Sequence, residues 1–284
     1  MPNGGPAGIL DKPVPASRNL MLRIASAAIL APLAIAIAYL GDWPFTTFWT
    51  MAAVAVWWEW IGLVQPQGRN VVLATGASIL ILEGILIQIG SGPLVIMMIA
   101  LGTLAAIVTA GRKGPLTCAG ILYASALLIA PVIIRGDISL GFAAILFVFA
   151  IVWGTDIGGY FAGRLIGGPK LAPAISPKKT WSGAVGGTIA GVGAGLAVAF
   201  WAYGQFSAPL VALAVGMSVA SQAGDLFESW LKRSVDAKDS GGLIPGHGGV
   251  MDRLDGFIFA AALAAFVGVL RGGFESPASG ILIW

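Results

Sequence analysis

Long apolar runs alternate with short polar connections along most of the chain. A membrane-spanning helix needs roughly 20 consecutive apolar residues. Nine runs of about that length cover residues 20–40, 43–64, 71–89, 93–110, 115–134, 138–165, 182–203, 208–231 and 250–270. The pattern predicts an all-α, polytopic integral membrane protein with about nine transmembrane helices.

The composition supports this class. Only 10% of the 284 residues are charged and 57% are hydrophobic, and the mean hydropathy is +0.90. A soluble domain typically carries about 25% charged residues. The single cysteine, Cys118, excludes an intrachain disulfide, so redox chemistry is not indicated.

We divide the chain into four segments. Residues 1–19 are expected to form a cytoplasmic tail, because they lack the apolar core and cleavage site of a signal peptide. Residues 20–137 contain the first five spans, and residues 138–271 contain the other four with two basic loops. Residues 272–284 are expected to form a C-terminal tail. Six glycines between 183 and 195 predict close helix packing.

The basic residues predict the orientation. With a cytoplasmic N-terminus, 14 of the 16 lysines and arginines lie at or near the cytoplasmic face, leaving Arg135 and Arg271 outside. The opposite orientation would invert this ratio. We therefore expect a site that faces the cytoplasm.

Six carboxylates are predicted to lie at a similar depth, a little below the cytoplasmic interface. Carboxylates in spans cost a few kcal/mol each and therefore require a reason. The six are Glu59, Asp156, Asp225, Glu228, Asp252 and Asp255, while Glu83 lies nearer the middle of the membrane. These carboxylates would repel one another unless cations lay among them. Because their ligand atoms are hard oxygens, Mg²⁺ is the favoured cation. Asp225, Asp252 and Asp255 are the first choices as metal ligands, followed by Asp156.

Two basic stretches adjoin these acids and indicate a phosphate-bearing ligand. The first follows the sixth span and contains Ser176, Lys178, Lys179 and Thr180. The second is a basic loop and a glycine-rich turn that precede the last span. It contains Lys232, Arg233, Lys238, Asp239, His247, Gly248, Gly249 and Arg253. We assign Lys232, Arg233 and Lys238 to the phosphates of this ligand. Ser176 and Lys179 could complete the same phosphate cradle or hold a second phosphate group, and we favour the cradle.

Structural interpretations of the same residues stay open. Asp252, Arg253 and Asp255 could serve as helix N-terminal charges and an ion pair. Lys178 and Lys179 could be positive-inside anchors, and His247 could orient the glycine turn by a hydrogen bond. Glu59 stands among three tryptophans, and we expect it to be structural and paired with a basic neighbour at the interface.

The run from Ser229 to Asp255 resembles the signature of the CDP-diacylglycerol synthases, or phosphatidate cytidylyltransferases. The shared pattern includes Lys232-Arg233, Lys238-Asp239, Pro245-x-His247-Gly248-Gly249 and Asp252-Arg253-Leu254-Asp255. Two upstream motifs are also similar to that family, from Asp156 to Arg164 and from Lys170 to Trp181. One departure is Ser182, where the family usually carries glutamate.

The resemblance implies a reaction of CTP with phosphatidic acid that gives CDP-diacylglycerol and pyrophosphate, with Mg²⁺ and room for a second cation. Asp225, Asp252, Asp255, Lys232 and Arg253 would be the catalytic residues. The expected partners are CTP, phosphatidic acid and the lipid bilayer, with no nucleic acid, and a homodimer is compatible with the sequence. The expected location is the bacterial cytoplasmic (inner) membrane.

Three alternatives remain at this point. An ion-coupled transporter would also place carboxylates and glycine-broken helices in the membrane, although near the midplane. A related cytidylyltransferase could act on another lipid phosphate. A CDP-alcohol phosphatidyltransferase would share Asp252-x-x-Asp255-Gly256, but the further downstream aspartates of that motif are absent.

Overall fold

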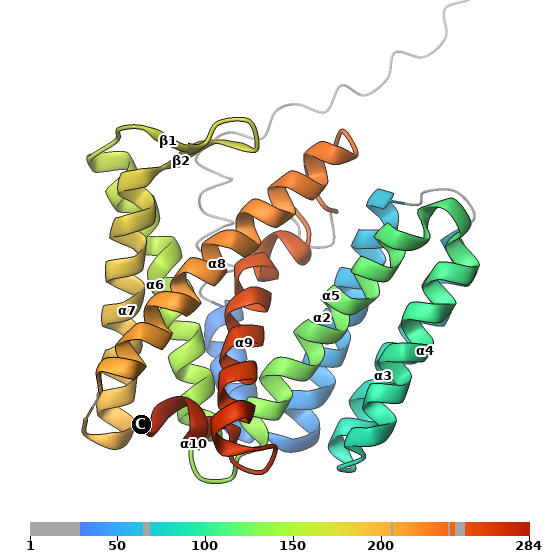
Figure 1. The fold of residues 1–284 in the computed structure, drawn as a ribbon, viewed down its shortest axis with the longest axis horizontal. Coiled ribbons are helices and arrows are strands. Elements are labelled where there is room, and N and C mark those ends of the chain that lie inside the picture. Colours follow the sequence, from blue (N-terminus) through green and yellow to red (C-terminus); the bar gives the residue numbers. More distant parts are fainter. Residues whose placement is uncertain (1–28, 65–68, 206, 238, 242–247) are drawn as a thin grey trace, which may run out of the picture.

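The computed structural model describes residues 29–64, 69–205, 207–237, 239–241 and 248–284. Within these ranges the chain is almost entirely helical (Figure 1). Eight helices are long and apolar enough to cross a membrane, which confirms the polytopic helical class. They are α2 (Asp42–Val64), α3 (Arg69–Gln88), α4 (Gly92–Ala110), α5 (Gly114–Gly136), α6 (Gly141–Leu165), α7 (Trp181–Tyr203), α8 (Ala208–Ser234) and α9 (Met251–Gly272).

These eight helices correspond to eight of the nine predicted spans. The predicted first span, 20–40, is described only from residue 29, where Ile29–Leu40 forms a shorter apolar helix. A 3₁₀ turn, Gly111–Lys113, joins α4 to α5, and a short helix, α10 (Pro277–Leu282), lies near the C-terminus. One boundary differs from the prediction: Lys232 and Arg233 form the last turn of α8 rather than a loop.

Helices α6 and α7 form the most extensive helix pair of the molecule. Their backbones are in contact because glycines line both faces. A Cβ on Gly154 would lie 2.9 Å from the Cα of Gly191, and one on Gly183 would lie 2.9 Å from the carbonyl oxygen of Gly159. The expectation of close packing is therefore confirmed.

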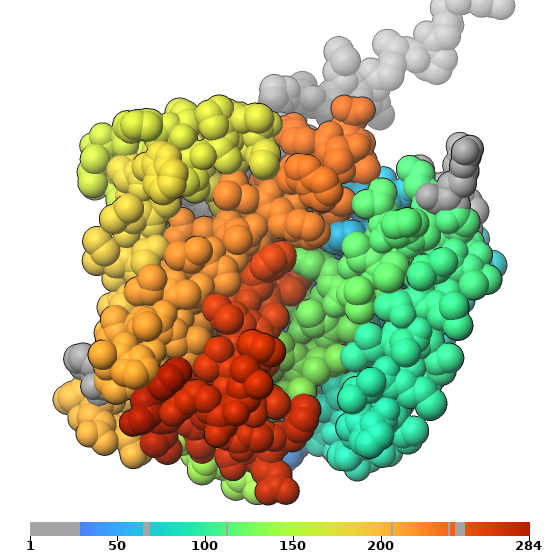
Figure 2. Space-filling model, in the orientation of Figure 1, coloured from blue at the N-terminus to red at the C-terminus, as the bar shows by residue number. Residues whose placement is uncertain are grey.

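The connection between α6 and α7 contains an antiparallel hairpin of β1 (Lys170–Ala172) and β2 (Ser176–Thr180). Thr180 ends the hairpin and caps α7, because its Oγ1 accepts a hydrogen bond from the Gly183 amide at 3.1 Å. Ser182 donates a hydrogen bond to the Gly167 carbonyl and so closes the same connection. The hairpin lies at the same end of the molecule as the end of α8 (Figures 1 and 2).

The opposite end is closed by α10, which packs on α9, α6 and α5. Asp137, between α5 and α6, accepts hydrogen bonds from the amide and hydroxyl of Ser279 at 2.9 and 3.1 Å. Burial raises the pKa of Asp137, but hydrogen bonds from Ser139, Ser279 and Leu140 outweigh it and leave the pKa below its ordinary value. Arg271 reaches the Ile283 carbonyl and lies 3.6 Å from the ring of Trp284.

Candidate active site

A cavity of about 390 Å³ lies between α6, α7, α8 and the hairpin. Its size falls in the range of about 300–1,000 Å³ that is usual for small-molecule sites. Polar side chains dominate its chemistry: the wall includes Asp156, Arg164, Lys178, Lys179, Thr180, Gln222 and Asp225. The structure thus brings together two of the predicted metal ligands and three of the predicted phosphate-binding residues.

The closest charge pair in this cavity joins the hairpin to α8. The Nζ of Lys179 lies 2.6 Å from Oδ2 of Asp225, and the two side chains are 29% and 21% exposed. A strand in the connection therefore delivers an ammonium group directly to a carboxylate on a spanning helix. Lys179 therefore contacts a carboxylate of the site and is more than a positive-inside anchor at the membrane interface.

Two glycines allow α8 and α9 to cross closely at the acids. A Cβ on Gly224 would lie 3.0 Å from a ring carbon of Phe259, and one on Gly256 would lie 2.8 Å from Oδ1 of Asp225. Asp255, which accepts a hydrogen bond from the Gly256 amide at 2.9 Å, is thereby placed beside α8. Asp255 lies within electrostatic range of Asp225 and also of Asp156.

A second charged group lies where α8 ends and α9 begins. Lys232 Nζ is 2.7 Å from Glu228 Oε2 and 2.7 Å from Asp252 Oδ1. The other oxygen of Asp252 accepts hydrogen bonds from the amides of Gly249 at 2.8 Å and Ser240 at 3.3 Å. Both oxygens of Asp252 thus have protein partners, and Lys232 connects two carboxylates.

The remaining predicted residues occupy varied positions. Arg253 is exposed and lies within electrostatic range of Asp156. Arg233 and Asp239 are exposed. Ser176 is at the start of β2, and it is not part of the wall that the described residues form around the cavity. Gly248 has a φ of +79°, which favours glycine. Lys238 and His247 lie outside the described residues.

Glu59 of α2 contributes to this region in a way that sequence reasoning missed. Its side chain is buried, and its oxygens accept hydrogen bonds from the amides of Val250 at 2.9 Å and Met251 at 2.8 Å. The expected basic partner is wrong for the described part of the chain, where no ion pair of Glu59 is found. Its isolation in an apolar, tryptophan-rich helix was the available signal; its partners, nearly 200 residues away, could not be read from the sequence.

The oxygen-rich cluster suits a hard cation such as Mg²⁺. Two buried side-chain oxygens in it, Ser221 Oγ and Glu228 Oε1, have no hydrogen-bond partner within the described part of the chain, and Lys179 supplies one positive charge beside Asp225. Among the described residues, no three Asp, Glu, His or Cys side chains surround one point as a ready-made metal cage. The oxygen donors fit a hard cation, and Lys179 and Lys232 lie among these carboxylates.

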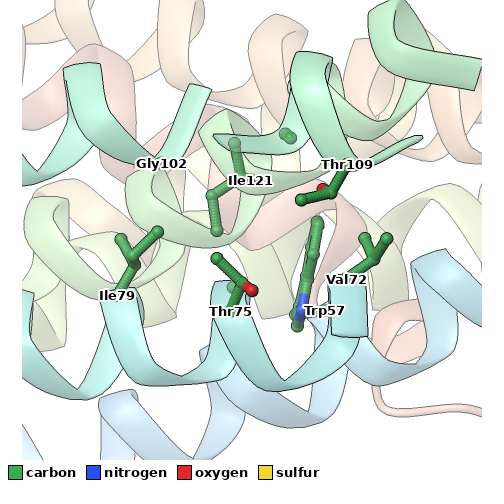
Figure 3. Close-up of a pocket in the computed structure, with 9 residues that line it drawn as sticks. Trp57, Val72, Thr75, Ile79, Gly102, Thr109 and Ile121 are labelled. Carbon is green, nitrogen blue, oxygen red and sulfur yellow. The ribbon is translucent and has the colours of Figure 1, made fainter. Parts of the chain in front are cut away.

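Two other hollows differ in character. A small pocket between α2, α3, α4 and α5 is lined by uncharged residues such as Trp57, Ile79 and Ile121 (Figure 3). A groove of about 430 Å³ between α7 and α8 is mostly apolar, with Trp181, Val185, Ile189, Val219 and Leu226 in its wall. This groove shares Leu171, Ala184 and Gln222 with the polar cavity, so the two adjoin.

The sequence is similar to those of known cytidylyltransferases. The model of the cytidylyltransferase family matches residues 21–270. A phosphatidate cytidylyltransferase of Brucella suis biovar 1 (strain 1330) is 43% identical over 267 residues, which are 92% of this chain and 97% of the relative. One from Bacillus subtilis (strain 168) is 42% identical over 130 residues, covering 45% of this chain and 48% of the relative. This membrane-embedded chain therefore belongs to the cytidylyltransferase family.

Proposed function

We propose that the protein is a phosphatidate cytidylyltransferase. A phosphate oxygen of phosphatidic acid attacks the α-phosphorus of CTP, a new P–O bond forms, and the bond to the β-phosphate breaks. The products are CDP-diacylglycerol and pyrophosphate. Nucleophile, electrophile and leaving group are all anionic, so the catalyst must mainly neutralise charge and align the reactants.

The observation that carries the proposal is the junction of a charged cavity with an apolar groove. The cavity offers cations from Arg164, Lys178 and Lys179 to phosphates. The groove beside it offers apolar surface to an acyl chain, and both share Ala184 and Gln222. An amphiphilic phosphate fits this combination. An ion-coupled transporter binds its substrate near the bilayer midplane, whereas Asp252 lies in the first turn of α9 and the hairpin of the cavity lies at one end of the helices.

Within the cavity, we assign Lys179 and Lys178 to the triphosphate of CTP. Lys179 lies 2.6 Å from Asp225, so a phosphate would compete with this carboxylate for the ammonium group. Arg164 is also in the wall of this cavity, and Arg253 lies within electrostatic range of Asp156. We assign Lys232 to keeping Asp252 in position through their ion pair, and in addition to a contact with phosphate.

Asp225 and Asp255, with Asp156, would hold Mg²⁺ in this proposal. The ion would supply positive charge to the triphosphate that the lysines alone do not provide. Asp252 is a further candidate ligand, but it would first have to part from Lys232, 2.7 Å away. The protein's own carboxylates would fix the position of the site relative to α8 and α9.

The proposal includes the orientation of the site. The hairpin, the end of α8 and the connection between α4 and α5 lie at one end (Figure 1), and these segments carry seven of the 16 lysines and arginines. Arg135 and Arg271, in the last turns of α5 and α9, lie toward the opposite end. By the positive-inside rule the end with the hairpin faces the cytoplasm, from which CTP would arrive.

The test is a reaction in mixed micelles with purified protein, CTP, Mg²⁺ and phosphatidic acid. We expect CDP-diacylglycerol and pyrophosphate to form in equal amounts, and no pyrophosphate without the lipid. Replacing phosphatidic acid with an isoprenoid phosphate or an ether-linked analogue distinguishes the related substrates. Absence of product from every lipid phosphate, together with solute flux in proteoliposomes, would contradict the proposal.

A further inference from the structure

The buried Glu59 of α2 organises the start of α9 from a distant part of the chain. It accepts hydrogen bonds from the amides of Val250, the N-cap residue of α9, and Met251, the first residue of α9. The first amides of a helix have no partner within the helix. Val250, at the N-cap position, provides no side-chain cap. Glu59 therefore caps α9 in place of a local residue, and its carboxyl group faces the positive end of the helix dipole.

The same side chain also holds the polypeptide that leads to α9. Ser240 Oγ donates to Glu59 Oε2 at 3.2 Å. A Cβ on Gly241 would lie 2.7 Å from Glu59 Oε1, and a Cβ on Gly249 would lie 2.8 Å from Glu59 Cδ. These two glycines are required by the close approach of the backbone to Glu59. Both described ends of the stretch 241–249 thus meet at one buried carboxyl group.

Glu59 is itself held rigidly by its neighbours in α2. Trp57 donates from Nε1 to the Leu73 carbonyl of α3 at 3.2 Å, and Figure 3 shows its ring beside Val72 and Thr75. Trp60 donates from Nε1 to the Leu116 carbonyl of α5 at 2.9 Å. Both indoles are 1% exposed. One residue on each side of Glu59 is therefore attached to a different helix, which fixes the direction of the carboxyl group.

The consequence concerns two acids of the candidate active site. Asp252 and Asp255 lie in the first turns of α9, one and four residues after Met251. Asp252 adds a parallel contact, because it accepts from the Gly249 and Ser240 amides next to those held by Glu59. The position of both aspartates relative to Asp225 on α8 then depends on where α9 begins.

We propose that Glu59 is a positioning residue for the cytidylyl transfer: it caps α9 and thereby sets the placement of Asp252 and Asp255. This inference rests on the proposed function. Glu59 does not touch the substrates; it acts through the backbone of α9. Small displacements of catalytic groups reduce turnover strongly, and a shift of about 1 Å can cost about 100-fold.

The test uses Glu59→Ala and Glu59→Gln, with Glu83→Gln as the matched control. Glu83 is a buried glutamate on α3 that accepts from Ser125 at 3.1 Å, outside the candidate site. Each variant is first checked by size-exclusion chromatography for elution as a folded protein. Glu59→Ala should then lower kcat by about 10- to 100-fold, while KM for phosphatidate changes little. Glu59→Gln, which keeps an acceptor oxygen, should fall between it and the wild type. Glu83→Gln should keep the wild-type kcat.

Amide hydrogen exchange gives a readout that does not require turnover. In Glu59→Ala the amides of Val250 and Met251 should exchange faster than in the wild type, and in Glu83→Gln they should not. Wild-type kcat in folded Glu59→Ala, or unchanged protection of both amides, overturns the inference. A wild type that makes no CDP-diacylglycerol refutes the proposed function instead, and the exchange comparison still decides whether Glu59 caps α9.

Discussion

Replacement of Lys179 by alanine tests the most direct contact in the cavity. The substitution removes the ammonium group that lies 2.6 Å from Asp225 and leaves the backbone of β2 unchanged. Two effects should follow. The protein loses an ion pair, and CTP loses one cationic partner. Lys170, an exposed lysine on β1 that is not in the wall of the cavity, is the matched control for a general loss of positive charge.

The structure sets the size of both effects. Exposed ion pairs contribute about 0.2–1 kcal/mol, whereas breaking a buried pair costs about 3–5 kcal/mol. The side chains of Lys179 and Asp225 are 29% and 21% exposed, so we expect a loss of about 1–3 kcal/mol of stability. A hydrogen bond to a charged group contributes about 1.5–3 kcal/mol. Because CTP must compete with Asp225, the lower end applies, and CTP affinity should fall about tenfold.

Two measurements separate the assignments. Isothermal calorimetry without lipid gives the CTP dissociation constants of the wild type, Lys179→Ala and the control Lys170→Ala. Steady-state assays then give the KM values for CTP and for phosphatidate, because KM alone is not always a dissociation constant. We expect Lys179→Ala to weaken CTP binding and to raise KM for CTP far more than for phosphatidate.

The double variant Lys179→Ala/Asp225→Asn completes a thermodynamic cycle for stability. If the pair is the source of the lost stability, the two single changes should not be additive. Unchanged CTP affinity in Lys179→Ala, with weaker saturation by phosphatidate, would refute the triphosphate assignment and place Lys179 at the lipid head group.

Further predictions concern the acids, the topology and the outer end. Asp252→Asn should retain less than about a tenth of wild-type turnover at saturating Mg²⁺, a barrier increase of about 1.4 kcal/mol, with normal membrane insertion; greater retention argues against a metal-ligand role. Cysteine at Lys170 should be labelled only from the cytoplasm and cysteine at the exposed Ile138 only from outside; labelling of both from one side would refute the orientation. Because the folded-state pKa of Asp137 is lowered, its contribution to stability is present above the ordinary aspartate pKa and disappears as the pH falls through the lowered value. The melting temperature of wild type should therefore fall in strong acid more than that of Asp137→Asn, and Ser279→Ala should weaken the same dependence; equal acid profiles would contradict this.

Hydropathy was sufficient to predict the helical class and eight of the spans, since lipid makes the apolar run itself the structural signal. The glycines of α7 predicted close helix packing, but the identity of the partner, α6, comes from the structure. Glu228 and Lys232 are four residues apart, a spacing that predicts their ion pair on a helix. On the sequence alone, Lys232 is instead assigned to phosphate.

Other features depend on contacts that local sequence does not encode. The hairpin between α6 and α7 has only three and five residues in its strands, too few for a clear alternating pattern. The partners of Glu59 lie 191 and 192 residues away. Lys179 meets Asp225 across 46 residues. The hairpin and both of these contacts depend on how the helices pack against one another, and hydropathy does not predict that packing.

The attachment of α10 has a consequence for the biosynthesis of the protein. Asp137 and Ser279 are 142 residues apart, and the Arg271 side chain reaches the Ile283 carbonyl. The ribosome therefore has to synthesise α10 before α5, α6 and α9 can be tied together at this end. Until α10 emerges, the inserted helices lack this closure, and a stop codon shortly before residue 277 would leave them permanently without it.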